Sequence, residues 1–598
     1  MDRFAHRLRK NASGELPSQY VFVDTETTAE VDADGAEHHT LEFGWACFTR
    51  VRSKNGKEWT HDDWFRFETI DEFWTWVEGL IRPKIRLYLV CHNFGFDGAI
   101  LALDRELPAR GWDIGLWITD TGPPTIIKAR KNKSSIVAVD SLNWFRSSLA
   151  ELGTSLGIEK LPMPDLSDRE AADTYCRRDV EIVREAMLQL RAFVRSQDLG
   201  NFQLTAAGQA FTAWRHRHMQ GDVFVHDRDR VLKAERLAYS GGRVSVFRLG
   251  RIPGDTYYLD VNSLFPSEMY LHDFPTAFES LTIDPTLSEL ASALETHCVM
   301  AEVKLTTDTD AYIYRTDDRI LFPVGTFDAN LTTPELLYAL ENGHLHSINA
   351  MYLYSRAPLF RSYVSELYSA RLRFKREGNV SFAHLSKLLL NSLYGRFAMR
   401  NRHWRDLRAA FPNEPTEQLI QDVPGGPTRR LRIRAGVLQE LDDGDEGKDS
   451  MPIVSAHVTA YARMRLLALI NKAGRANVHY VDTDSLFVNT DGFDRLQDEL
   501  HESRLGALKL EGTGALEIHG PKDYRFGDGA PTIKGIRKDA VPLGGGKYRQ
   551  SQFRSWNQGM RLGITGEVLI TPVTKTLHRA FKQGTVRPDG VVEPFVVG

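Results

Sequence analysis

The 598-residue chain has few cysteines and no long apolar run. Its cysteines, Cys47, Cys91, Cys176 and Cys298, form no C-x-x-C pair, which argues against a structural zinc or iron–sulfur site and favours reduced thiols. No run of about 18 apolar residues predicts a membrane span, and no apolar segment near the start predicts a signal peptide. Internal repeats are also missing. The 42% hydrophobic and 26% charged residues are typical of a globular protein with several domains.

The chain also lacks the excess of positive charge that is common in nucleic-acid-binding proteins, because its net charge is −4. Its basic residues gather instead in local clusters, at 128–133, 371–376, 396–408, 429–434 and 534–538. Phosphates are bound by local basic grooves rather than by the overall charge. Nucleic acid therefore remains a possible partner.

The pattern of the chain predicts an α/β domain followed by a larger mixed unit. In the first domain the expected strands are 20–23, 42–49, 87–90 and 135–139, and the expected helices are 71–80 and 168–194. The second unit begins near residue 230, with long helical stretches at 358–394 and 453–471. Residues 401–450 are polar and rich in Pro, Gly, Arg and Asp, which predicts an inserted loop or hairpin.

Four acidic residues of the first domain stand out, and they lie in three separate segments. Asp24 and Glu26 lie two residues apart in an apolar run, where residues i and i+2 of a strand point to the same side. Asp97 follows an Asn-x-x-Phe sequence, and Asp179 lies four residues after Tyr175 on a predicted helix. Such carboxylates can hold two metal ions that activate water and stabilise a leaving alkoxide, with a phenol orienting the water.

These segments resemble the three exonuclease motifs of DNA polymerase proofreading domains, D-x-E, N-x(2–3)-F/Y-D and Y-x(3)-D. The resemblance implies that Asp24, Glu26, Asp97 and Asp179 are metal ligands and that Tyr175 orients the attacking water. It also implies that Asn93 and Phe96 hold a frayed primer end. Residues 141–145 resemble the single-strand-binding element of protein-primed polymerases, which implies DNA contacts by Ser141 and Leu142. Lys160 resembles their lysine that contacts the scissile phosphate.

The larger unit contains a second set of carboxylates. Asp260 ends a predicted strand, and Asp482 and Asp484 lie inside the apolar run 479–488, on one side of a buried strand or hairpin. Two buried like charges are costly unless a cation neutralises them, and a divalent metal is the simplest candidate. Lys387, Asn391 and Tyr394 share one face of a predicted helix, where a cation and a rigid surface suit a nucleoside triphosphate.

These segments resemble motifs A, B and C of family B DNA polymerases. The resemblance implies metal ligands at Asp260, Val261 and Asp484, with Asp482 beside them. Two Mg²⁺ ions are expected in each active site, with Mn²⁺ as a substitute. Lys387 and Lys375 would bind the triphosphate. The other implied nucleotide contacts are Ser263, Leu264, Phe265, Asn391 and Tyr394.

Shorter matches extend the resemblance over nearly the whole chain. Residues 239–242 resemble the Y-x-G-G segment that coordinates the two active sites, which implies DNA contacts by Tyr239, Gly241 and Gly242. T-x-x-A/G-R and K-x-Y sequences imply further contacts by Thr459, Arg463, Lys522 and Tyr524. One residue departs from the family, which usually has tyrosine at position 265. Because Phe265 keeps the ring, we expect it still to exclude a ribose 2′-hydroxyl.

The resemblance predicts a ribonuclease-H-like exonuclease domain followed by a right-hand polymerase domain. The expected divisions are an exonuclease domain at 1–195, a linker at 196–245, palm and fingers at 246–525 and a thumb at 526–598. Insertions are expected at about 267–357, where protein-primed enzymes dock their terminal protein, and at about 401–450, as a hairpin that closes around DNA.

The two insertions, and a first motif only 24 residues from the start, favour a protein-primed, strand-displacing replicase of a phage, plasmid or mobile element. The expected partners are primer-template DNA, dNTPs and a terminal protein, with no membrane, for a monomer in the cytoplasm of the host cell. A primer-independent family B polymerase shares every motif quoted. Readings from other classes are a nuclease with a decayed polymerase unit and a non-enzymatic DNA-binding module. The intact carboxylates argue against both.

Overall fold

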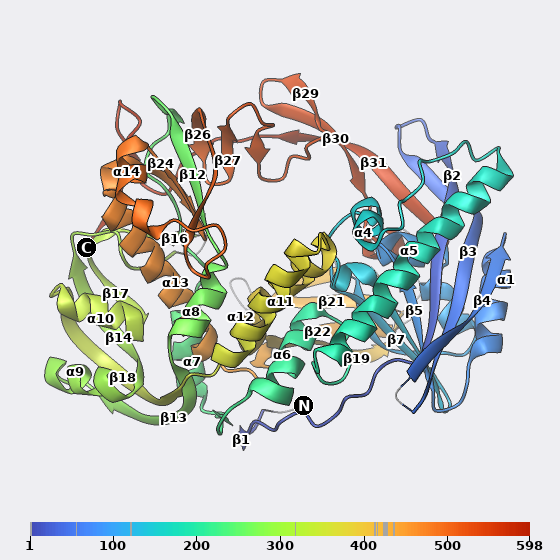
Figure 1. The fold of residues 1–598 in the computed structure, drawn as a ribbon, viewed down its shortest axis with the longest axis horizontal. Coiled ribbons are helices and arrows are strands. Elements are labelled where there is room, and N and C mark those ends of the chain that lie inside the picture. Colours follow the sequence, from blue (N-terminus) through green and yellow to red (C-terminus); the bar gives the residue numbers. More distant parts are fainter. Residues whose placement is uncertain are drawn as a thin grey trace.

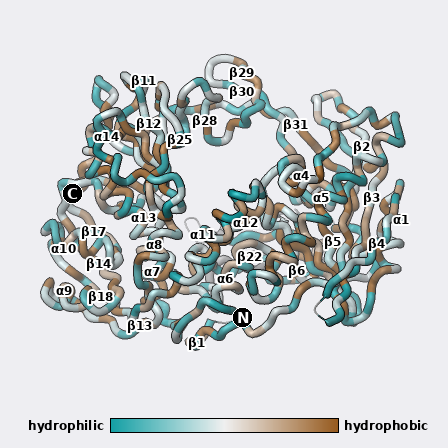
Figure 2. The backbone as a smooth tube through the Cα atoms, viewed as in Figure 1, coloured by the Kyte–Doolittle hydropathy of each residue, from teal (hydrophilic) through white to brown (hydrophobic). Residues whose placement is uncertain are grey.

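The structure is a computed structural model that describes residues 3–55, 57–119, 122–316, 319–411, 414, 417–421, 428–434, 437–561 and 563–598. Figure 1 shows two large β-sheet regions, one at each end of the long axis. Two helices lie in the middle between them, and a strand pair crosses from one region to the other. In Figure 2 the hydrophobic segments run mainly through the sheets and their covering helices.

The N-terminal region is built on a mixed sheet. Its strands are β2 (Gln19–Val31), β3 (Glu37–Lys54), β4 (Lys57–Phe67), β5 (Arg86–Cys91), β6 (Asp113–Thr119), β7 (Thr125–Lys131) and β8 (Ser134–Asp140). The order is β3-β2-β5-β8-β7-β6, with β4 paired to β3. The central strands β2, β5 and β8 are parallel, and they consist of the apolar runs expected of strands buried on both faces. All four predicted strands are therefore confirmed.

Helices pack on this sheet: α1 (Ile70–Leu80), α2 (Phe94–Ile100), α3 (Leu103–Ala109), α4 (Leu149–Leu156) and α5 (Arg169–Ser196). A short 3₁₀ turn, Ser141–Asn143, follows β8. Thr69 and Glu72 form a capping box that starts α1. The Asp168 side chain accepts a hydrogen bond from the amide of Ala171 and starts α5. The α/β prediction for this domain is confirmed, with both predicted helices in place.

Residues 196–245 pack as helices rather than as a loose linker. They form α6 (Ala206–Ala213), a π-helical turn (Trp214–His218) and α7 (Asp229–Ala238), and β9 (Phe224–Val225) pairs with β1 (His6–Arg7). Trp214 is fully buried, and its ring nitrogen donates a hydrogen bond to the carbonyl of Leu359, 2.8 Å away. The apolar residues of this predicted linker therefore belong to the core, and the division into domains stays a prediction.

The second region is centred on an antiparallel sheet of order β10-β23-β24-β12-β25. Its strands are β10 (Val244–Val246), β12 (Thr256–Val261), β23 (Val478–Asp482), β24 (Ser485–Val488) and β25 (Leu508–Gly514). Around it lie α8 (Leu264–Leu271), α13 (Pro452–Ala473) and α14 (Thr490–Arg495). Among the described residues, α13 alone is long and apolar enough to cross a membrane, but 78% of its most apolar window is buried inside the protein. It is therefore the core helix of this region.

Two antiparallel helices, α11 (Arg361–Arg376) and α12 (Val380–Phe397), occupy the middle of the molecule (Figure 1). The sequence predicted a single helical stretch over 358–394. The structure breaks it at Gly378, whose φ of +74° is a left-handed conformation that glycine adopts without strain. The chain therefore reverses, and motif B lies on the second helix.

Both predicted insertions are folded. The first forms a sheet of order β13-β18-β14-β17-β34, and the second a sheet of order β19-β22-β21-β20. The elements of the first are β13 (Phe274–Ile283), α9 (Leu287–Thr296), β14 (Cys298–Thr307), β15 (Tyr314–Arg315), β16 (Ile320–Leu321), β17 (Val324–Thr332), α10 (Thr333–Glu341) and β18 (Leu345–Ala357), and the last residues of the sequence add β34 (Val596–Val597) beside β17. Those of the second are β19 (Arg400–Ala409), β20 (Glu417–Gln421), β21 (Thr428–Arg434) and β22 (Val437–Glu446).

The predicted thumb, 526–598, does not form a separate body. A small sheet next to the palm contains β11 (Gly250–Arg251), β26 (Leu516–Gly520), β27 (Asp523–Phe526) and β28 (Thr532–Ile533). The arm that follows contains β29 (Val541–Gly544), β30 (Lys547–Phe553), α15 (Trp556–Arg561) and β31 (Glu567–Thr576). Strand β31 pairs with β3, so the arm extends the N-terminal sheet (Figure 1). The chain then returns through β32 (Thr585–Val586) and β33 (Val592–Glu593).

Two candidate active sites

The first site brings together all four predicted carboxylates of the N-terminal region. Asp24 and Glu26 lie on β2, directly before a register shift in its pairing with β3. Asp97 lies in the first turn of α2, and its Oδ1 accepts hydrogen bonds from the amide and hydroxyl of Thr25, at 3.1 and 2.8 Å. Asp179 projects from α5 and is buried. The exonuclease motifs, up to 155 residues apart in sequence, therefore converge on one site.

The electrostatics of this site call for a cation. Burial, followed by the charges of Asp97, Asp179 and Glu26, raises the pKa of Asp24 well above its usual range. Burial is also the largest cause that raises the pKa of Glu26 and of Asp97, each to about 7. Among the described residues, the buried Oδ1 of Asp179 has no hydrogen-bond partner. Buried, mutually repelling carboxylate oxygens are the ligands that a hard divalent cation prefers, so the residues present fit a metal site.

Lys160 and Tyr175 lie beside this cluster. The Lys160 ammonium contacts the Asp179 carboxylate and lies 4.1 Å from the centre of the Tyr175 ring. The predicted lysine is thus at the site, within reach of a phosphate that approaches Asp179. Its position also explains why its charge lowers the pKa values of Asp24 and Glu26, against the effect of burial.

Cys176 belongs to this site, although the motif comparison did not select it. Its Sγ lies 3.6 Å from Oδ2 of Asp24, and ligand atoms of Asp24, Glu26 and Cys176 all lie within 4.8 Å of one another. Burial, followed by the charges of Asp24 and Glu26, raises the pKa of the thiol well above its usual range. The thiol donates a hydrogen bond to Asp24. Its place next to Tyr175 is the only signal in the sequence that could have indicated this role.

The residues predicted to hold a primer end differ in how far their side chains are exposed to solvent. Asn93 has a left-handed φ of +69°, and its amide donates a hydrogen bond to Asp140 at 3.0 Å, which fixes the start of α2. Phe96 is partly exposed, with its ring centre 6.4 Å from that of Phe553 on the C-terminal arm. Leu142 is also partly exposed, but Ser141 is fully buried and bonded to His92 at 2.7 Å. The Ser141 hydroxyl is therefore engaged with His92 in this structure, and its contact with DNA stays a prediction.

The second site is formed by three neighbouring strands of the palm sheet. Asp260 on β12 is paired with Ser485 of β24, directly after Asp484. The amide of Val261 donates a hydrogen bond to the Asp484 carbonyl at 2.8 Å. Between β23 and β24, Thr483 has a left-handed φ of +65°. Asp482 ends one strand and Asp484 lies in the turn, which confirms the hairpin among the two predicted alternatives, a strand or a hairpin, but the two aspartates do not share one strand face.

The two aspartates of motif C have different partners. Asp482 accepts a hydrogen bond from the Tyr480 hydroxyl at 3.0 Å and lies 3.5 Å from the Lys522 ammonium. Asp484 instead faces Asp260. Burial, then the charge of Asp484, raises the pKa of Asp260 to about 7. Asp260 and Asp484 are therefore the pair that fits a divalent cation, and Asp482 stands beside them as expected.

Basic side chains from the two central helices reach this pair. The charge of Lys387 on α12 acts on both Asp260 and Asp484, where it lowers the pKa against the effect of burial. Lys375 on α11 is close enough to Arg371, Lys509 and Lys387 for their charges to lower its pKa, after burial. Concentrated positive charge next to a metal-binding pair suits a triphosphate.

Arg371 is a further cation that the sequence singled out only as part of a basic cluster. Its guanidinium donates a hydrogen bond to the Ser263 hydroxyl, and its charge acts on Asp260. Because it precedes Lys375 by four residues, the two lie on one helix face. This spacing is the signal that could have identified it.

Two aromatic rings form a surface next to the aspartates. The rings of Phe265 on α8 and Tyr394 on α12 are stacked, with centres 5.0 Å apart and planes 20° from parallel. Burial, then the charges of Tyr239 and Asp484, raises the pKa of Tyr394 to about 12. Asn391 lies one turn earlier on α12 and is partly exposed. The side chain of Leu264 is buried, so a nucleotide would meet its backbone.

Comparisons with known proteins agree with this geometry. Residues 167–405 match the family model described as DNA polymerase type B, organellar and viral. The DNA-directed DNA polymerase of Enterobacteria phage PRD1 is 26% identical over 531 residues, which cover 86% of this chain and 84% of the phage protein. Both matches agree with the predicted resemblance to the family B DNA polymerases. Family B polymerases use divalent metal ions, and both sites offer suitable carboxylates.

Other relatives cover less of their own length. A probable DNA polymerase of Neurospora intermedia is 26% identical over 324 residues, which are 51% of this chain and 32% of the relative. A DNA polymerase of Kluyveromyces lactis is 25% identical over 61% of this chain and 38% of its own length. The chain thus spans about a third of these fungal relatives. The phi29 DNA polymerase in its ternary complex matches with a TM-score of 0.70 and 17% identity, over 94% of this chain and 100% of that chain, which shows the fold.

The remaining family B motifs lie around the palm. Gly242 packs so closely on the turn of motif C that an added Cβ would lie 2.9 Å from Cγ2 of Thr483, whereas Gly241 has open space. The Lys522 amide donates a hydrogen bond to the Tyr480 hydroxyl at 3.0 Å. Tyr524 packs on Tyr480, with ring centres 5.6 Å apart. The K-x-Y segment therefore also braces the strand that carries Asp482.

The T-x-x-A-R residues of the family do not face solvent. The Thr459 side chain is buried and donates to carbonyls of its own helix, at 3.1 Å from Ser455 O and Ala456 O. The Arg463 guanidinium is buried against Glu335, 2.7 Å away. The predicted DNA contacts of these two side chains stay predictions. Arg463 joins the palm to the first insertion through Glu335.

Proposed function

We propose that the protein is a DNA-directed DNA polymerase with a separate 3′→5′ exonuclease, and that it acts as a protein-primed, strand-displacing replicase. The observation that carries the proposal is the presence, in one chain, of two buried carboxylate centres with different surroundings. One has a lysine and a phenol beside it, and the other has three cations and a stacked aromatic surface. The first arrangement suits hydrolysis of a phosphodiester, and the second suits transfer of a nucleotide.

At the polymerase site each group has a distinct task. Asp260 and Asp484 would hold two Mg²⁺ ions, with Mn²⁺ as a substitute. When bound, these ions polarise the phosphate oxygens and offset charge at the attacking and leaving oxygens. Lys387, Lys375 and Arg371 would neutralise the triphosphate as the primer 3′-hydroxyl attacks the α-phosphate and pyrophosphate leaves. The stacked ring of Phe265 would close the space that a ribose 2′-hydroxyl needs.

At the exonuclease site the same type of ion would lie between Asp24, Glu26, Asp97 and Asp179. Tyr175 would orient the attacking water, and Lys160 would neutralise the scissile phosphate. Phe96 and Leu142, both partly exposed, would contact the frayed primer end. The substrates would be primer-template DNA and dNTPs. The further expectations are a terminal protein docked on the first insertion, a monomeric state and the cytoplasm of the host cell.

Two single substitutions test the two-site assignment. Asp24→Asn should abolish degradation of single-stranded DNA and leave primed extension intact, whereas Asp484→Asn should do the reverse. The near-isosteric Asn keeps the packing while it removes the charge. Loss of both activities from either variant, at unchanged melting temperature, would contradict two independent sites.

Priming is tested on single-stranded template with labelled nucleotide and Mg²⁺, with and without an oligonucleotide primer. Extension only when primed supports a replicase that needs a supplied primer. Long products from unprimed template would favour the second candidate, a primer-independent family B polymerase. Silence on both templates would contradict polymerase activity and leave the nuclease.

A further inference from the structure

The first insertion is joined to the polymerase centre through the Y-x-G-G segment. Arg315 of β15 donates hydrogen bonds to the Tyr239 carbonyl at 2.9 Å and to the Ser240 hydroxyl at 2.6 Å. Arg463 of α13 donates to the carbonyls of Ser240 and Gly241, at 3.2 and 3.0 Å. The same guanidinium is paired with the buried Glu335 of the insertion. The backbone of this segment is therefore fixed by two charged side chains. Arg315 belongs to the insertion, and Arg463 is paired with it.

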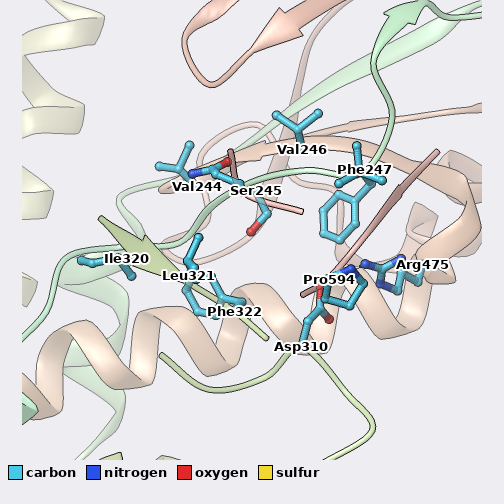
Figure 3. A pocket seen from close by; sticks show the side chains of 12 residues that line it. Val244, Ser245, Val246, Phe247, Asp310, Ile320, Leu321, Phe322, Arg475 and Pro594 are labelled. Carbon is cyan, nitrogen blue, oxygen red and sulfur yellow. Dashed lines mark hydrogen bonds and ion pairs between the residues drawn. The ribbon is translucent and has the colours of Figure 1, made fainter. Parts of the chain in front are cut away.

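Arg243, the residue after the Y-x-G-G segment, makes a second connection to the insertion. The side chain of Arg243 is 1% exposed, and its guanidinium donates hydrogen bonds to the carbonyl and the carboxylate of Asp310, both at 2.7 Å. Asp310 lies in the loop between β14 and β15 of the insertion. Arg475 also bonds the Asp310 carboxylate, at 3.2 Å. Figure 3 shows Asp310 and Arg475 side by side in a cavity of about 20 Å³.

Both connections end on the turn of motif C. The Arg243 carbonyl accepts a hydrogen bond from the Thr483 amide at 2.7 Å. The next residue, Val244, is paired with Asp482 across β10 and β23. Gly242 packs directly on Thr483. Thr483, with its left-handed φ, is thus held by residues outside its own hairpin. Asp484 follows Thr483, so the position of Asp484 depends on that residue.

We propose that the first insertion positions the motif C turn through Asp310–Arg243 and Glu335–Arg463, and that these four are positioning residues of the polymerase centre. That the insertion positions the turn does not depend on the proposed function. The expected effect on nucleotide transfer does rest on it. The ion pairs are buried, and a charged group left without its partner in the interior is costly. The insertion therefore cannot shift relative to the Y-x-G-G segment without loosening Thr483. A partner bound to the insertion would act on nucleotide transfer by this route.

The test uses the full chain with Asp310→Asn and Glu335→Gln, singly and together. Both changes remove a charge and keep the size, and the amide oxygen introduced by Glu335→Gln could still accept the capping bonds that Thr332 now donates to the carboxylate. Asp308→Asn is the matched control, because Asp308 lies in the same loop with its side chain 92% exposed. Arg243→Lys is the conservative variant, which keeps the charge but loses one of the two bonds to Asp310.

The first readout is amide hydrogen exchange over residues 478–488, which needs no substrate. We expect the double variant to exchange about tenfold faster there than the control, because the bond from Thr483 opens more often. The second readout is single-nucleotide incorporation on primed DNA. We expect kcat to fall about tenfold with KM changed less than about twofold, since Asp484 acts in the chemical step. Arg243→Lys should fall between the double variant and the control.

Exonuclease activity separates positioning from general damage, because its site lies in the other domain. It should stay within about twofold of the wild type in every variant. Exchange and kcat equal to those of Asp308→Asn would overturn the proposal, and so would equal losses of both activities. A wild-type protein without polymerase activity would refute the proposed function instead. The exchange of residues 478–488 would then still decide whether the insertion holds the turn.

Discussion

Trp556→Ala should release the C-terminal arm from the N-terminal domain. The Trp556 side chain is 4% exposed, with its ring centre 4.8 Å from that of Trp117 and 6.4 Å from that of Phe94. Its Nε1 donates a hydrogen bond to Asp104 at 3.2 Å. The packing is tight, since a Cβ on Gly98 would lie 2.6 Å from the indole. Truncation of a buried tryptophan costs about 3–5 kcal/mol.

This loss falls on the docking of the arm, whose other attachments are the pairing of β31 with β3, a hydrogen bond from the Thr119 hydroxyl to Asn557 and the Phe553 ring next to Phe96. Strand β31 pairs with only four residues of β3, Glu37–Thr40. The ion pair of His38 with Glu567 is partly exposed, so solvent screens it and it adds little to the docking. A drop of about 3 kcal/mol in the free energy of opening corresponds to a rise of about 100-fold in the open population.

Hydrogen exchange of peptides from 547–553 and 567–576 measures this opening. We expect exchange there to accelerate about 100-fold in Trp556→Ala, while the palm peptides keep their rates. Trp59→Ala is the control, because Trp59 is 47% exposed on β4 and truncation there removes little packing. Equal exchange in the two variants would refute the conclusion that Trp556 anchors the arm.

Two further predictions concern the sugar contact and acid stability. Phe265→Ala should raise ribonucleotide incorporation relative to deoxynucleotide incorporation by about tenfold or more, because the stacked ring would no longer close the space that a ribose 2′-hydroxyl needs. The measurement is the ratio of the two kcat/KM values. An unchanged ratio would place the discrimination at another residue. Burial lowers the pKa of His457 to about 4. The unfolded chain therefore binds the proton first as the pH falls below about 6.5, and stability is lost down to about pH 4, with about 2 kcal/mol lost by about pH 5. His457→Gln should reduce the fall in urea midpoint between about pH 7 and about pH 5, and an equal fall in both proteins would contradict the burial effect.

The sequence predicted which carboxylates come together, because these acids lie in short, local patterns. Asp24 with Glu26, and Asp260 with the pair in the motif C turn, stand out as acids inside apolar runs. An apolar strand and a long amphipathic helix each leave a periodic pattern, so the four central strands of the N-terminal sheet, the strands at Asp260 and Asp482 and the longest helices were also predicted. The break at Gly378 was missed, since a glycine within a helical pattern does not by itself end the helix.

The parts that the sequence did not predict depend on contacts between distant segments. Thr459 and Arg463 match a DNA-contact motif, but their burial follows from the insertion that supplies Glu335. Cys176 reaches Asp24 only because α5 crosses β2. The tail after 525 was predicted as one thumb, because nothing in β31 itself indicates that its partner is β3. Strand pairing between such distant parts of the chain leaves no local pattern.

The two active sites are joined by a continuous core as well as by the chain. Phe382 at the start of α12 lies 5.6 Å from Phe145 and 5.7 Å from Phe193, both from the N-terminal domain, measured between ring centres. Phe374 of α11 closes the cluster at 5.5 Å from Phe382. The helix that carries Lys387 is therefore anchored on the exonuclease side. Because close-packed cores do not deform continuously, a movement of this helix toward Asp260 must either open the cluster or carry the exonuclease domain with it.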